Sequence, residues 1–99
     1  MAKRRRARLG FTPQQHTKLA REERAKADDL LRRARDTARR GECTSAVLFL
    51  AQGERKAGMA WANALNHIGD MAPFSRLLAL ADDIRQDVTH NCTVKRRAG

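Results

Sequence analysis

The sequence predicts an all-α fold: a three-helix bundle, built from an antiparallel helical hairpin and a third helix, with disordered basic arms at both ends. Strong helix formers dominate the central part of the chain, and no segment alternates between apolar and polar residues as a strand would. Charge separates the arms from the body. Of the 21 lysines and arginines, five fall in residues 1–8 and three in residues 95–97, whereas all 11 acidic residues lie between these segments.

These observations divide the chain into a flexible basic arm over 1–11, a helical body over 12–90 and a basic tail over 91–99. The arms have too little apolar surface to offset the entropy lost on ordering. A body of about 80 residues is close to the lower size limit for independent stability. We therefore expect a partner, a crosslink or an oligomer to assist it.

The first helix is predicted over 13–40. Thr12 and Gln15 have the spacing of a capping box, and Pro13 suits the first helical position because its missing N–H has no intrahelical partner there. Gly41 stands where a left-handed C-terminal cap is required.

The second and third helices are predicted over 44–68 and 73–89. Glu42 or Thr44 would cap the second, and Gly69 would stop it. Pro73 would lie in the first turn of the third helix, whose apolar residues recur at helical spacing: Phe74, Leu77, Leu78, Ala81, Ile84 and Val88.

Two heptad seams predict how the hairpin packs. The first helix contributes Ala20, Arg24, Ala27, Leu31, Ala34 and Ala38; the second contributes Ala46, Leu50, Gly53, Ala57, Ala60 and Ala64. Folding the chain back at Gly41 places Leu31 against Gly53, so a large residue meets a small one. The second helix has further apolar residues, which we expect the third helix to cover: Val47, Leu48, Phe49, Met59, Trp61, Leu65 and Ile68.

Cys43 and Cys92 are the only cysteines. In an up-down-up bundle they lie at the same pole, so they either form a disulfide or remain free thiols in a reducing cytoplasm. No metal site is expected, because His90 and Cys92 have no further ligands at a suitable spacing.

The sequence favours a protein that is not an enzyme and has no cofactor. His16, His67 and His90 have no neighbouring residues that resemble a catalytic group. The paired carboxylates Glu22–Glu23, Asp28–Asp29 and Asp82–Asp83 are expected on solvated faces, with Asp28 and Asp29 bonded to Arg32 and Arg33 four residues on.

The basic residues are the candidate nucleic-acid-binding groups. The arms contribute Lys3, Arg4, Arg5, Arg6, Arg8, Lys95, Arg96 and Arg97. Arg32, Arg35 and Arg39 share one face of the first helix, where they would bind phosphate or pair with Asp82, Asp83 and Asp87 of the third. Long antiparallel helices leave no short recognition helix, and four aromatic residues are too few for rows of stacked bases. Binding independent of base sequence is therefore expected.

A set of short features resembles small basic proteins encoded by bacteriophages. The basic start is followed by Leu9-Gly10, Thr12-Pro13 and His16. Gly41-Glu42-Cys43 begins an alanine-rich helix that contains Arg55 and Gly58. Cys92 precedes the basic end of the chain. Some phage proteins of this kind, notably those of tailless icosahedral single-stranded-DNA phages, bind the genome inside the capsid. The resemblance implies a virion component.

We therefore expect a nucleic-acid-binding protein that neutralises packaged phosphates, with single-stranded DNA the favoured ligand and RNA the other, and a body that docks on a capsid or another large assembly. Its expected location is the virion or the host cytoplasm, since the sequence shows neither a signal peptide nor a membrane span. The alternatives are a ribosome- or nucleoid-associated protein and a helical adaptor that binds a partner helix through Phe49, Met59 and Trp61.

Overall fold

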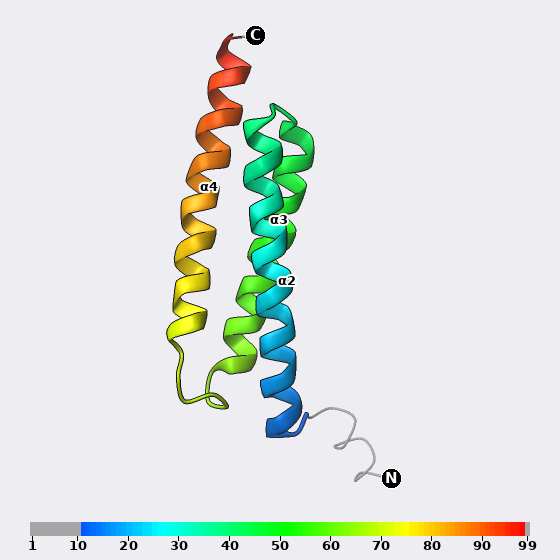
Figure 1. Cartoon of the computed structure of the whole chain (residues 1–99), viewed down its shortest axis with the longest axis vertical. Helices are drawn as coiled ribbons and strands as arrows, with labels where there is room; N and C mark the ends of the chain where they lie inside the picture. Colours follow the sequence, from blue (N-terminus) through cyan, green and yellow to red (C-terminus); the bar gives the residue numbers. More distant parts are fainter. Residues whose placement is uncertain (1–10, 99) are drawn as a thin grey trace.

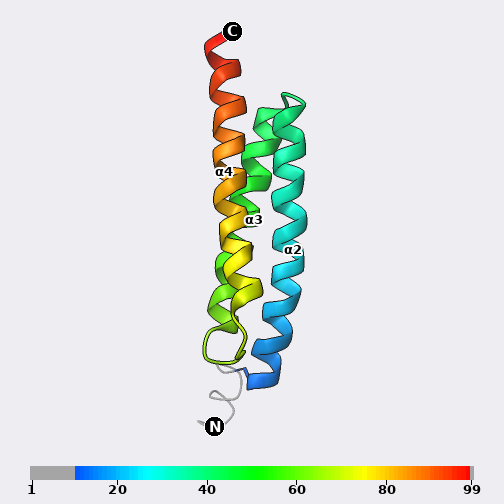
Figure 2. The ribbon, with the colours of Figure 1, turned by 60° about the vertical axis from the view of Figure 1, so that its left-hand side comes forward.

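The computed structural model describes residues 11–98, and side chains over 11–93. Within that part of the chain there are three helices and no strands: α2 (Pro13–Arg39), α3 (Cys43–Ala64) and α4 (Ala72–Ala98). Figures 1 and 2 show α2 and α3 running antiparallel, with α4 alongside them. The predicted all-α, three-helix fold is confirmed.

Both ends of α2 form as the sequence predicts. Thr12 accepts a hydrogen bond from the backbone N–H of Gln15, and the Gln15 side chain accepts one from the N–H of Thr12, which completes the capping box. At the other end Gly41 has a φ of 83°. The N–H of Gly41 donates to Ala38 and the N–H of Glu42 donates to Thr37, the two bonds of a Schellman motif.

Helix α3 ends four residues earlier than predicted, at Ala64 rather than near Ile68. The cause is Asn66, whose φ of 73° lies in the left-handed region that asparagine tolerates better than most residues. At its start, Glu42 is the N-cap residue but makes no side-chain capping bond. Its carboxylate is instead bonded to Arg40.

Helix α4 is longer than predicted, because it continues through Ala98 instead of ending near Thr89. The predicted boundary of the tail at residue 91 therefore falls inside the helix. No glycine or proline interrupts residues 74–98, and lysine and arginine are favourable near the negative end of a helix dipole. Figures 1 and 2 show the end of α4 extending past the α2–α3 turn.

The two seams form the core of the hairpin, with one change. Every predicted seam residue is buried except Arg24, which is exposed; Glu23 is buried in its place. The predicted contact between Leu31 and Gly53 is confirmed: a Cβ at Gly53 would lie 2.8 Å from Cδ2 of Leu31. Nine of the sixteen buried core residues are alanine, which lets the helices approach closely but limits the apolar area that stabilises the bundle.

The third helix covers less of α3 than expected. Phe49, Trp61 and Ile68 pack against the core. Four of the other apolar side chains remain 40–58% exposed: Val47, Leu48, Met59 and Leu65. Val47, Leu48 and Met59 belong to α3, and Leu65 directly follows its last residue. Leu78 on α4, expected in the core stripe, is also exposed.

Candidate nucleic-acid interface

The predicted basic arms lie largely outside the described part of the chain. Lys3, Arg4, Arg5, Arg6 and Arg8 fall outside the described residues, and for Lys95, Arg96 and Arg97 only the helical backbone is described. Their attachment points are nevertheless fixed. The start of α2 lies at one pole and the end of α4 at the other (Figure 1), on a rod whose longest extent is 60 Å.

Cys43 and Cys92 are joined by a disulfide, with their Cα atoms 5.7 Å apart. The bond ties the last turns of α4 to the first turn of α3. Cys92 lies three residues before Lys95, so the disulfide fixes where the basic end of α4 leaves the bundle.

Five arginines of the body form salt bridges with carboxylates. Arg32 and Arg33 pair with Asp28 and Asp29 within α2, at 2.9 and 3.0 Å, as the i,i+4 spacing predicts. The other three pairs are Arg39–Asp87 at 3.2 Å, Arg40–Glu42 at 3.3 Å and Arg85–Glu54 at 2.6 Å. The side-chain hydrogen bond to Asp28, more than its charge, raises the pKa of Arg32; hydrogen bonds to Glu42 and Glu54 likewise raise the pKa values of Arg40 and Arg85.

One of the two roles expected of the arginine stripe on α2, pairing with the third helix, is seen for one of its three residues. Arg39 pairs with Asp87 of α4, which is the internal salt bridge, whereas Arg32 pairs within its own helix. Arg35 forms no salt bridge among the described residues, and its Nε atom is shielded from solvent without a hydrogen-bond partner. Of these three arginines, Arg35 alone has no salt-bridge partner among the described side chains.

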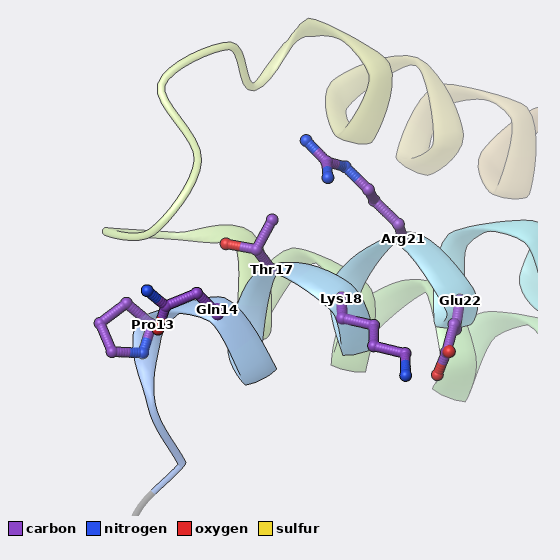
Figure 3. A pocket seen from close by; sticks show the side chains of 6 residues that line it. All are labelled: Pro13, Gln14, Thr17, Lys18, Arg21 and Glu22. Atoms are coloured by element: carbon purple, nitrogen blue, oxygen red, sulfur yellow. The ribbon is translucent and has the colours of Figure 1, made fainter.

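Eight of the 13 basic residues in 11–93 have no carboxylate oxygen within 4.0 Å among the described side chains. They are Lys18, Arg21, Arg24, Lys26, Arg35, Arg55, Lys56 and Arg76. Arg21 and Arg24 follow Thr17 at helical spacing, and Figure 3 shows Thr17 and Arg21 rising from the side of α2 near the start of α4, while Lys18 and Glu22 lie on the other side. The 470 Å³ hollow in that view is lined by α2 alone.

A second cationic feature lies between two helices. Arg24 and Arg32 of α2 and Arg76 of α4 line a groove of about 330 Å³, together with Asp28. Sequence reasoning missed Arg24 and Arg76. The spacing of Arg21, Arg24, Asp28, Arg32 and Arg35 on one face of α2 is the signal that could have found the first of them.

A buried polar network, also missed, connects α2 to α3. Glu23 was expected on a solvated face but is only 3% exposed. Asn63 donates its amide to Glu23 Oε1 at 2.8 Å, and its Oδ1 lies 2.9 Å from Nδ1 of His16. The Asn63 amide also donates to the carbonyl of Met59, so Oδ1 must be the acceptor and His16 Nδ1 the donor. The His16 ring stacks on His67 at 4.3 Å.

The three residues expected to anchor a partner helix differ in exposure. Phe49 and Trp61 pack against the core, and only Met59 of the three predicted contact residues is exposed.

Neither metal nor membrane features accompany these sites in the part of the chain that the structure describes. No group of three or more His, Cys, Asp or Glu residues there could hold a metal ion. None of the described helices combines the length and apolar character needed to cross a membrane. Comparisons of the sequence and structure with protein-family models, curated proteins and solved structures find no match.

Proposed function

We propose that this protein binds nucleic acid through its phosphates, without reading base sequence and without catalysing a reaction. The observation that carries this proposal is the number of basic residues that have no carboxylate partner. Eight basic residues lie in the two terminal segments, which hold no acidic residue, and eight more in the body have no salt-bridge partner among the described side chains. Such a charge excess attracts polyanions and releases their counterions.

The helical body supports binding that is indifferent to sequence. Its helices are 22 to 27 residues long and pack lengthwise, so no short helix projects to enter a major groove. Phe49, Trp61 and Phe74 pack in or against the core, which leaves Phe11 as the one exposed aromatic ring of the described residues. Base stacking would therefore add little to the electrostatic attraction.

The resemblance to small basic phage proteins gives the proposal its setting: single-stranded DNA inside a phage particle, with RNA as the other ligand. A disulfide suits that setting, because disulfides persist outside the reducing cytoplasm. The capsid would then be the assembly on which the body docks.

The test is binding of the full chain to single-stranded DNA, double-stranded DNA and RNA across a salt series. It is compared with a variant in which Lys3, Arg4, Arg5, Arg6 and Arg8 are replaced by glutamine. On single strands, each lost phosphate contact should reduce the slope of log K against log salt by about 0.7. The helical content of the variant, from circular dichroism, should match the wild type. Weak binding of all three nucleic acids by the wild type at low salt would contradict the proposal.

A further inference from the structure

We propose that the groove between α2 and α4 is a built phosphate-binding site that holds two neighbouring phosphates of one strand. The proposal rests on the proposed function and assigns a surface of the folded body to it. Three arginines from two helices converge on this groove of about 330 Å³: Arg24 and Arg32 from α2 and Arg76 from α4. Helix packing, rather than sequence proximity, brings Arg76 to the other two.

The charges of the groove do not cancel. Asp28 is its only acidic lining residue, and this carboxylate is already engaged by Nε of Arg32 at 2.9 Å. Arg24 and Arg76 have no carboxylate oxygen within 4.0 Å among the described side chains. Three guanidinium groups against one carboxylate leave the groove with two uncompensated positive charges.

The arginines are positioned for anions. The guanidinium carbon of Arg24 lies 5.8 Å from the centroid of the Phe74 ring, and Phe74 is buried, so this contact restrains Arg24 beside the first turn of α4. Arginine presents its N–H groups as a planar fork that matches two phosphate oxygens.

The length of the site sets the number of phosphates. Arg24 and Arg32 are eight residues apart, which is about 12 Å along the helix, more than one phosphate needs. Leu77 and Leu80 also line the groove, and such apolar side chains suit contact with a sugar. The groove includes no exposed aromatic ring, so it would hold the backbone and leave the bases unread.

The groove also has a defined end. Beyond Arg32, α4 presents Asp83 and then Asp87, which pairs with Arg39. Arg35 and Arg39 on the facing side of α2 are balanced by these two carboxylates, so no excess positive charge among the described side chains continues beyond the groove. The site is therefore confined to the half of the bundle where α4 begins.

The experiment compares two double variants of the full chain that lose the same charge. R24Q/R76Q removes the two unpaired arginines of the groove, and R55Q/K56Q removes two unpaired cations of α3 that do not line it. Affinity for oligothymidylate is measured across a salt series. We expect R24Q/R76Q to lower the salt slope by about 1.4, which corresponds to two phosphates at about 0.7 each, and R55Q/K56Q, whose cations belong to the general charge excess but not to the groove, to lower it by much less. Equal changes of the salt slope in both variants would contradict the proposal that the groove binds phosphates.

A second measurement separates failure of the groove from failure of nucleic-acid binding. Inorganic pyrophosphate is titrated into the wild type while the Nε–H signals of the arginine side chains are followed by NMR. Saturable shifts confined to Arg24, Arg32 and Arg76 support the groove even if oligothymidylate does not bind, in which case only the proposed function fails. If oligothymidylate binds while pyrophosphate shifts no groove arginine, the groove fails and the proposed function stands.

Discussion

Two glycines of α3 provide a direct test of how the hairpin packs. Gly53 faces Leu31, and a Cβ built on Gly53 would lie 2.8 Å from Leu31 Cδ2, 2.9 Å from Cγ and 3.2 Å from the backbone nitrogen. Leu31 is fully buried, so its side chain has little room to move away. A Cβ on Gly58, five residues along the same helix, would meet nothing within 4 Å.

Alanine at both sites changes helix propensity by the same amount but packing by different amounts. Gly58→Ala should raise the free energy of unfolding by about 1 kcal/mol, the propensity difference between the two residues. Gly53→Ala gains the same term but overpacks the interface between α2 and α3, at a cost of about 1–3 kcal/mol. We therefore expect Gly53→Ala to be no more stable than the wild type and less stable than Gly58→Ala by the whole overpacking cost.

Thermal unfolding followed by circular dichroism measures this difference. In a domain of this size 1 kcal/mol corresponds to about 4–8 °C in Tm, so the two variants should differ by at least that interval, with Gly58→Ala above the wild type. If both substitutions raise Tm equally, Gly53 does not face a closely packed leucine and the register of the hairpin is refuted.

Three further predictions concern the disulfide, the polar network and the arginines. Reducing the Cys43–Cys92 bond, which joins residues 49 apart, should lower the free energy of unfolding by about 4 kcal/mol; a denaturation midpoint that does not fall in reductant would contradict this. Asn63→Ala should cost about 1–3 kcal/mol, because Glu23 then stays buried without its donor; an unchanged urea midpoint would show that the network is not stabilising. The hydrogen bond to Asp28 raises the pKa of Arg32, so Arg32 stays charged at neutral and mildly alkaline pH, and its pairing is lost at the alkaline end only as pH rises through that raised pKa. Oligothymidylate binding should therefore be unchanged from about pH 7.5 to about pH 9.5, and a steep loss within that range would implicate groups other than arginine.

Local signals predicted the helix starts and the hairpin turn well, because each depends on a few neighbouring residues. The capping box at Thr12 and the left-handed Gly41 formed as expected. The end of α3 was missed because Asn66 can take the same left-handed conformation as glycine. The length of α4 was missed because charge density was taken as a sign of disorder, although lysine and arginine are good helix formers.

The candidate site was predictable only where its contacts are local. The pairs Asp28–Arg32 and Asp29–Arg33 follow from i,i+4 spacing within one helix. Arg24 was assigned to the core because it continues a heptad. Its neighbour Glu23 is about 100° from Arg24 around the helix, and because the seam lies between the two, Glu23 is almost as close to it. The choice between them depends on Asn63, which reaches Glu23 from α3, 40 residues along the chain. A periodicity argument cannot detect such a partner.

The small size of the core residues explains why α4 is held by specific links as well as by packing. Alanine seams bring α2 and α3 close together, so the hairpin is thin and offers α4 a narrow apolar surface. Each described interface of α4 adds an ion pair to its apolar contacts, Arg39–Asp87 with α2 and Arg85–Glu54 with α3. Exposed ion pairs contribute little to stability individually, whereas the disulfide acts on the unfolded chain and does not depend on buried area. The covalent bond is therefore the contact that a core built mainly of alanine most needs. It lies at the pole where the basic end of α4 extends beyond the bundle.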